Sequence, residues 1–159
     1  MVPTVEWKEG AVRLLDQSRL PSQVEFLDCR DYRSVAQAIR ELKVRGAPAI
    51  GVTAAMGVAL GAQSVDADEY SSFVKQVDAI CDHLAASRPT AVNLFWAIAR
   101  MKQKLASLKG MPIAEIKRDL IRESQSILDE DIALCKAMGR HGATVIQNGQ
   151  TILTHCNAG

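Results

Sequence analysis

Aromatic residues are scarce in this chain, at 4% of 159 residues, although hydrophobic residues make up 48%. With so few large rings, the core has to be built from Ala, Val, Ile and Leu, which favours close-packed helices over an aromatic-rich β-sandwich. The most apolar segment, residues 48–60, is shorter than the roughly 20 residues that a membrane-spanning helix needs. We therefore expect a helix-rich domain with no membrane partner.

The chain also has no large excess of one charge sign. Its 19 Lys and Arg residues are nearly balanced by 18 Asp and Glu residues, which gives a net charge of +1. The one local basic cluster is formed by Lys102, Lys104 and Lys109. It is most simply the solvated face of a helix. Nucleic acid is therefore not an expected partner.

Paired cysteines are absent as well. Cysteines stand at positions 29, 81, 135 and 156, with no C-x-x-C pair and no metal-ligand spacing, so no metal site is expected. Cys81 and Cys135 fall at apolar positions of helical patterns, which is typical of buried free thiols. No charged region followed by an apolar core opens the chain, and a reducing cytoplasm is the expected compartment.

Three short apolar runs, over residues 2–8, 12–15 and 24–27, predict a small antiparallel β-meander with turns at Glu9-Gly10 and Pro21-Ser22. A helix is then expected after Asp31, a good capping residue. Its apolar residues recur with helical spacing, at Val35, Ala38, Ile39 and Leu42.

Four further helices are predicted. The first, over 48–60, is apolar nearly all round, and Gly51 and Gly57 would let neighbouring helices approach it closely. The others cover about 68–86, 90–108 and 112 to at least 138. The helix over 68–86 has one apolar face, made of Phe73, Val77, Ile80, Cys81 and Leu84.

The segment after the last helix has two interpretations. Residues 144–147 and 150–153 flank Asn148-Gly149, which suits a type I′ turn, and local pattern favours a β-hairpin. Alternatively, the helix continues through Val145 and turns at Asn148-Gly149 into the first strand of a new domain.

Two arginines precede helix starts. Arg45 is followed by Gly46-Ala47-Pro48, and Arg88 by Pro89-Thr90. A guanidinium beside free amides at a helix N-terminus suits a phosphate monoester, because Arg can hold two oxygens at once. Taken singly, each motif is more often a surface arginine next to an ordinary helix cap, because most helix N-termini bind nothing; two such motifs in one short chain favour an anion site more strongly.

Cys156 follows an apolar strand-like run and precedes the small residues Asn157-Ala158-Gly159, whose free amides would favour a thiolate. A lone cysteine at a strand end is more often a packing residue. His155 is a poor base for this thiol, because neighbours on a strand point to opposite faces.

Three segments resemble the signature segments of the methylthioribose-1-phosphate isomerase family: Val44–Gly51, Arg88–Ala97 and Leu153–Gly159. They occur in the family's order and at compatible spacing. The stretch from Leu14 to Pro21 is similar too, so the resemblance covers essentially the whole chain.

The resemblance implies an α+β fold. It predicts a three-stranded antiparallel β-meander and helical bundle over residues 1–111 and a long connecting helix over 112–147. Residues 148–159 then begin a truncated Rossmann-like α/β domain. On this basis Gln150 to His155 is expected as that domain's first strand, in place of the hairpin. A cytoplasmic homodimer is implied for the full-length protein.

The resemblance also implies a function, the aldose–ketose isomerisation of 5-methylthioribose 1-phosphate in methionine salvage, with no cofactor. Phosphate and sugar contacts fall on Arg45, Gly46, Ala47 and Arg88, and the essential cysteine on Cys156. Asn157 and Gly159 share its turn and are further substrate-binding candidates. The family's catalytic Asp lies downstream of Gly159, so we expect the 159 residues alone not to turn over substrate.

Two other functions stay open. One is isomerisation of ribose 1,5-bisphosphate, whose second phosphate would require another basic contact. The other is a non-catalytic regulatory role, like that of the α, β and δ subunits of the nucleotide-exchange factor in translation initiation. Such subunits would not need Cys156 or the pair Arg45 and Arg88.

Overall fold

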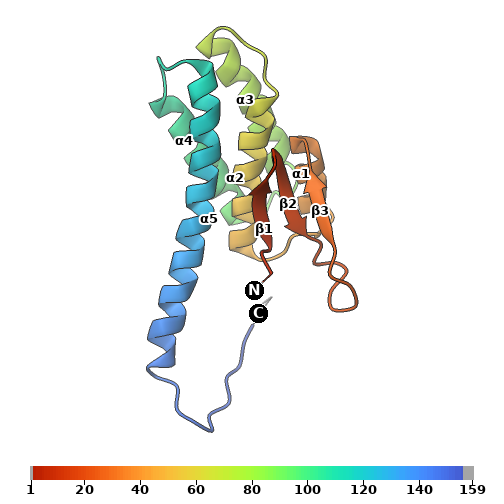
Figure 1. Cartoon of the computed structure of the whole chain (residues 1–159), viewed down its shortest axis with the longest axis vertical. Coiled ribbons are helices and arrows are strands. Elements are labelled where there is room, and N and C mark those ends of the chain that lie inside the picture. Colours follow the sequence, from red (N-terminus) through yellow and green to blue (C-terminus); the bar gives the residue numbers. More distant parts are fainter. Residues whose placement is uncertain (1, 156–159) are drawn as a thin grey trace.

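The structure is a computed structural model that describes residues 2–155. Its described part contains a three-stranded antiparallel sheet followed by five helices (Figure 1). The strands are β1 (Val5–Lys8), β2 (Ala11–Leu15) and β3 (Phe26–Cys29). The helices are α1 (Tyr32–Arg40), α2 (Ala47–Gln63), α3 (Tyr70–Ala85), α4 (Val92–Ser107) and α5 (Ile113–Ala143). The predicted α+β class is confirmed.

The sheet is a meander in the order β1-β2-β3. Lys8 pairs with Ala11, so Glu9 and Gly10 form a two-residue turn, and both have positive φ angles of 49° and 75°. Two positive φ angles are the mark of the type I′ turn that matches strand twist. The third strand lies two residues later than predicted, because Cys29 is the residue that reaches the core, whereas Val24 is 62% exposed.

Helix α1 begins where the sequence predicts. The Asp31 carboxylate accepts hydrogen bonds from the amides of Arg33 and Ser34, at 2.8 and 2.9 Å. The prediction is wrong at Leu42, which lies beyond the helix with φ 59° and is 43% exposed. The chain reverses there, and the next residues lead directly into α2.

Helix α2 is the centre of the molecule. It packs against the other four helices and against β1 and β2, and every residue from Ile50 to Ala62 is buried. A Cβ on Gly57 would lie 2.9 Å from Val35 Cγ1 and 3.1 Å from Leu84 Cδ2, so a larger residue here would force the side chains of α1 and α3 to shift. All five residues predicted for the buried face of α3 are buried. Within residues 2–155, no helix combines the length and apolar character needed to cross a membrane.

Helix α5 runs beyond the bundle (Figure 1). Its buried residues, Ile116, Leu120, Ser124 and Ile127, all lie in its first half. Cys135 is therefore exposed, contrary to the prediction that it is buried, because it lies on the half that extends past the other helices. The helix continues through Gly139 to Ala143, beyond the minimum end at residue 138 that the sequence predicts.

The segment after α5 forms no hairpin, because residues 144–147 are assigned to no strand. A turn does occur at Asn148-Gly149, where Gly149 has φ 87° and the Gln150 amide donates to the Gln147 carbonyl at 3.2 Å. Residues 150–155 also form no strand, unlike the prediction. A strand requires a hydrogen-bonded neighbour, and the described sheet contains only β1, β2 and β3.

The buried thiols of Cys29 and Cys81 are expected to react more slowly than the exposed thiol of Cys135. Burial raises the pKa of the Cys29 thiol and raises that of Cys81 to about 12. At pH 8 we expect iodoacetamide to label the exposed Cys135 in the native protein far faster than Cys81, since Cys81 is buried and its raised pKa leaves little of the nucleophilic thiolate. Peptide mapping by mass spectrometry checks this, and unfolding in guanidinium should equalise the rates. Rapid native labelling of Cys81 would contradict the packing around α2.

Candidate phosphate site

The first half of the site is the loop that leads into α2. Gly46 is the N-cap, with φ 92° and ψ 128°, and no side chain caps the helix. The Ala47 amide, in the first turn, has no intrahelical acceptor and is available to a ligand. The Arg45 side chain is held by a hydrogen bond from Nε to the Leu42 carbonyl at 3.1 Å. Gln17 fixes this loop to the meander, since its backbone amide donates to the Lys43 carbonyl at 2.8 Å.

The second half is the loop that leads into α4. This helix begins at Val92, two residues later than predicted, with Ala91 as N-cap and again no side-chain cap. The Ala91 amide donates to the Arg88 carbonyl at 3.1 Å, which forms a tight turn carrying Arg88 towards the helix start. The Ser87 hydroxyl donates to the Leu84 carbonyl at 2.6 Å and anchors the loop to α3.

These two loops, 43 positions apart by residue number, meet at one groove of about 560 Å³. Its lining consists of Arg45, Gly46, Ala47, Ile50, Arg88, Thr90, Ala91, Val92 and Asn93. Four of the residues predicted to bind phosphate and sugar therefore line the same groove. Within residues 2–155, neither arginine forms an ion pair and no carboxylate lines the groove, so both positive charges remain available to an anion.

Gly51 allows the two helix starts to come together. A Cβ at this position would lie 2.9 Å from the backbone carbonyl oxygen of Asn93. Backbone cannot rotate away as a side chain can, so any larger residue would push the start of α4 outward. From the sequence, Gly51 is predicted to allow close packing of a neighbouring helix, and that neighbour is α4.

Gly51→Ala is expected to lower the free energy of unfolding by about 1–3 kcal/mol, because the added methyl group meets backbone. Gly139→Ala is the matched control. It also lies inside a helix, but its Cβ would meet nothing within 4 Å, so it should stabilise by about 0.5–1 kcal/mol. Urea unfolding measures both changes. Equal effects of the two variants would contradict the close approach of α2 and α4.

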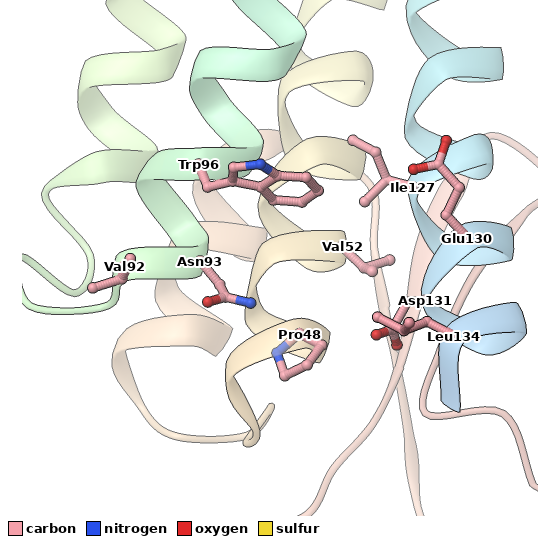
Figure 2. A pocket seen from close by; sticks show the side chains of 9 residues that line it. All are labelled: Pro48, Val52, Val92, Asn93, Trp96, Ile127, Glu130, Asp131 and Leu134. Carbon is pink, nitrogen blue, oxygen red and sulfur yellow. The ribbon is translucent and has the colours of Figure 1, made fainter. Parts of the chain in front are cut away.

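A second groove, of about 470 Å³, adjoins the first and shares Val92 and Asn93 with it. Figure 2 shows Asp131 and Leu134 of α5 opposite Pro48 and Val52 of α2. Partial burial raises the pKa of the Asp131 carboxyl. Asp131 was not among the predicted site residues, although it lies four residues after the buried Ile127 and therefore on the same face of α5.

Arg100 joins α4 to α5 beside this second groove. Its Nε donates to Glu123 at 2.7 Å and its Nη2 to Glu130 at 2.7 Å. The guanidinium holds the pKa of the Glu130 carboxyl below its usual range. Of the two acidic residues in the groove, Glu130 is thus neutralised, whereas Asp131 has no ion-pair partner among the described residues.

The remaining predicted site residues, Cys156, Asn157 and Gly159, lie outside the described residues. Among residues 2–155, no group of three or more His, Cys, Asp or Glu side chains is arranged to hold a metal ion.

Comparison with known proteins gives consistent matches. The model of the initiation factor 2 subunit family matches residues 43–159. Among curated proteins, the methylthioribose-1-phosphate isomerases of Trichlorobacter lovleyi and Geobacter metallireducens are 56% and 55% identical to this chain, in alignments that cover 98% of its length. The chain spans 45% of the length of each of these two relatives.

Two solved structures share the fold. The 5-methylthioribose 1-phosphate isomerase from Pyrococcus horikoshii OT3 is 38% identical with a TM-score of 0.89, over 94% of this chain and 42% of that one. The delta subunit of translation initiation factor eIF-2B from A. fulgidus is 37% identical with a TM-score of 0.87, over 100% of this chain and 46% of that one. Since the family model matches well over half of its residues, the chain belongs to the initiation factor 2 subunit family.

Proposed function

We propose that this chain carries the phosphate-binding part of an aldose–ketose isomerase that converts 5-methylthioribose 1-phosphate to 5-methylthioribulose 1-phosphate in methionine salvage. The observation that carries the proposal is the meeting of Arg45 and Arg88, with two uncapped helix N-termini, at one groove free of described carboxylates. Guanidinium groups and helix-terminal amides together bind a phosphate monoester well. The names of the curated relatives support this substrate.

The chemistry requires more than phosphate binding. With the anomeric oxygen phosphorylated, the sugar cannot simply open to an aldehyde, so an acid must assist departure of the ring oxygen. The described lining of the phosphate groove offers no carboxylic acid. In this proposal the acid is an Asp located beyond residue 159, and the 159 residues alone bind substrate without turning it over.

Cys156 is the proposed catalytic residue of the chain. It would act near C1 and C2 of the sugar, either as the base of an enolate route or as part of a shielded site for a hydride shift. Asn157 and Gly159 would contact the substrate from the same turn. Residues 148–159 would begin a Rossmann-like domain, and the complete protein would be a cytoplasmic homodimer that needs no cofactor.

One other function is favoured by a specific observation. The eIF-2B delta subunit shares this fold at a TM-score of 0.87, which supports a non-catalytic subunit as the second candidate. A subunit of that kind would have no need for a phosphate groove with two unpaired arginines.

Turnover of 5-methylthioribose 1-phosphate by a fusion protein tests the proposal. Residues 1–159 are joined to the C-terminal half of the Trichlorobacter lovleyi relative, which matches this chain at 56% identity. We expect the fusion to isomerise the substrate and the 159 residues alone to bind it without turnover. A fusion that folds but neither binds nor isomerises the sugar phosphate would favour the non-catalytic subunit.

A further inference from the structure

The second groove has a character opposite to that of the phosphate groove. Its walls are largely apolar, formed by Pro48 and Val52 of α2, Trp96 of α4, and Ile127 and Leu134 of α5 (Figure 2). Trp96 is 50% exposed and Leu134 is 60% exposed, so both present apolar surface to whatever enters. No Lys or Arg is among the described residues that line it.

The two grooves adjoin, because Val92 and Asn93 line both of them. A sugar phosphate anchored between Arg45 and Arg88 can therefore extend its far end along α2 towards α5. That end would pass from a region with two unpaired positive charges to one with a single unpaired negative charge, on Asp131. Glu130 adds little to this field, because Arg100 and Lys104 together balance the charges of Glu130 and Glu123.

We propose that Asp131 is a specificity-determining residue, which together with the apolar walls admits sugar 1-phosphates bearing an uncharged 5-substituent and rejects those bearing a second phosphate. The inference rests on the proposed function, since it requires the 1-phosphate to occupy the groove of Arg45 and Arg88. It separates the methylthio sugar from ribose 1,5-bisphosphate, the substrate of the alternative isomerase.

The selection follows from two effects. A methylthio group loses contact with water when it lies against Trp96, Leu134 and Val52, which is favourable by the hydrophobic effect. A phosphate group in the same place would be desolvated against apolar walls and repelled by the Asp131 carboxylate, with no basic residue in the groove to compensate.

Calorimetric titration of the 159-residue chain at pH 8 tests the proposal with three probes: 5-methylthioribose 1-phosphate, ribose 1,5-bisphosphate and inorganic phosphate. The wild type should prefer the methylthio sugar to the bisphosphate. Asp131→Asn, which keeps the shape and removes the charge, should reduce that preference by about tenfold, chiefly by strengthening bisphosphate binding. Affinity for inorganic phosphate, which probes the arginine groove alone, should stay within about twofold.

Asp129→Asn is the matched control. It removes the same charge from the same helix, two residues away, but Asp129 is exposed and lines neither groove. An unchanged preference in Asp131→Asn, or an equal change in Asp129→Asn, would overturn the specificity role while leaving the proposed function intact. If none of the three probes binds the wild type, the proposed function fails and this inference fails with it.

Discussion

Replacement of both Arg45 and Arg88 by alanine will reduce the affinity for 5-methylthioribose 1-phosphate by about two to four orders of magnitude. Each guanidinium is expected to make charge-assisted hydrogen bonds to phosphate, and such bonds contribute about 1.5–3 kcal/mol each. The loss should be large because the groove offers no other cation among the described residues. Calorimetry on the 159-residue chain measures it directly.

The single variants distinguish a shared site from two separate ones. If Arg45 and Arg88 hold the same phosphate group, the losses of binding free energy in the two single variants will not sum to the loss in the double variant. Removal of one arginine lets the phosphate shift against the other, so the two contributions depend on each other. Arg45→Lys and Arg88→Lys should each recover only part of the affinity, since an ammonium cannot grip two oxygens as a planar guanidinium can.

Arg118→Ala with Arg122→Ala is the control for net charge. Both side chains are exposed on α5, and their ion-pair partners among residues 2–155 are acidic neighbours of the same helix, Glu115 and Asp119. This double variant changes the net charge as much as the groove variant does but should leave sugar phosphate binding nearly unchanged. Comparable losses in the two double variants would mean that the protein attracts the ligand by its overall field and that the groove is not the binding site.

The parts of the fold that sequence predicts well are those fixed by local chemistry. Asp31 caps α1 because its short carboxylate can reach the amides of the first turn, and this depends on nothing distant. Glu9-Gly10 forms the predicted turn for a similar reason, since glycine accepts a positive φ without strain. The all-apolar pattern of α2 also predicts its central position, because no face of such a helix can meet water.

The errors arise where neighbours decide the outcome. Cys135 fits the apolar pattern of α5, but the buried positions of this helix end at Ile127, and no element among residues 2–155 covers Cys135. Leu42 has the correct helical spacing, yet the chain reverses there to carry Arg45 to the start of α2. Residues 150–155 have strand-like composition, and composition alone supplies no partner strand.

The candidate site divides in the same way. The sequences Arg-Gly-Ala-Pro and Arg-Pro-Thr identify the two helix starts that follow an arginine. They do not indicate that the two helix starts meet. Their meeting depends on the packing of α2 against α4 through Gly51. Asp131 matches no signature segment and was therefore given no role. Its neighbours, Pro48 and Val52, come from a helix about 80 positions earlier in residue number, and sequence periodicity reports only the face of one helix.

Cys156→Ser will lower kcat of the fusion protein by at least about a thousandfold while leaving the affinity for 5-methylthioribose 1-phosphate within a few-fold of wild type. A serine hydroxyl is far less acidic than a thiol, whose usual pKa is about 8.5, so it cannot supply an anion or exchange a proton readily near neutral pH. In the proposed function Arg45 and Arg88 hold the phosphate, so binding should not depend on this thiol. Steady-state kinetics and calorimetry together separate the two effects.

Cys135→Ser is the appropriate control, because it makes the same chemical change at an exposed thiol on the outer half of α5. Its kcat should stay within about twofold of wild type, as expected for a surface substitution away from the reacting atoms. A near-normal kcat for Cys156→Ser would remove this residue from the mechanism and leave the arginine groove as a binding site alone. A loss of sugar phosphate affinity in Cys156→Ser, with kcat preserved, would instead make the thiol part of the binding surface, and the proton or hydride transfer would have to be assigned to other groups.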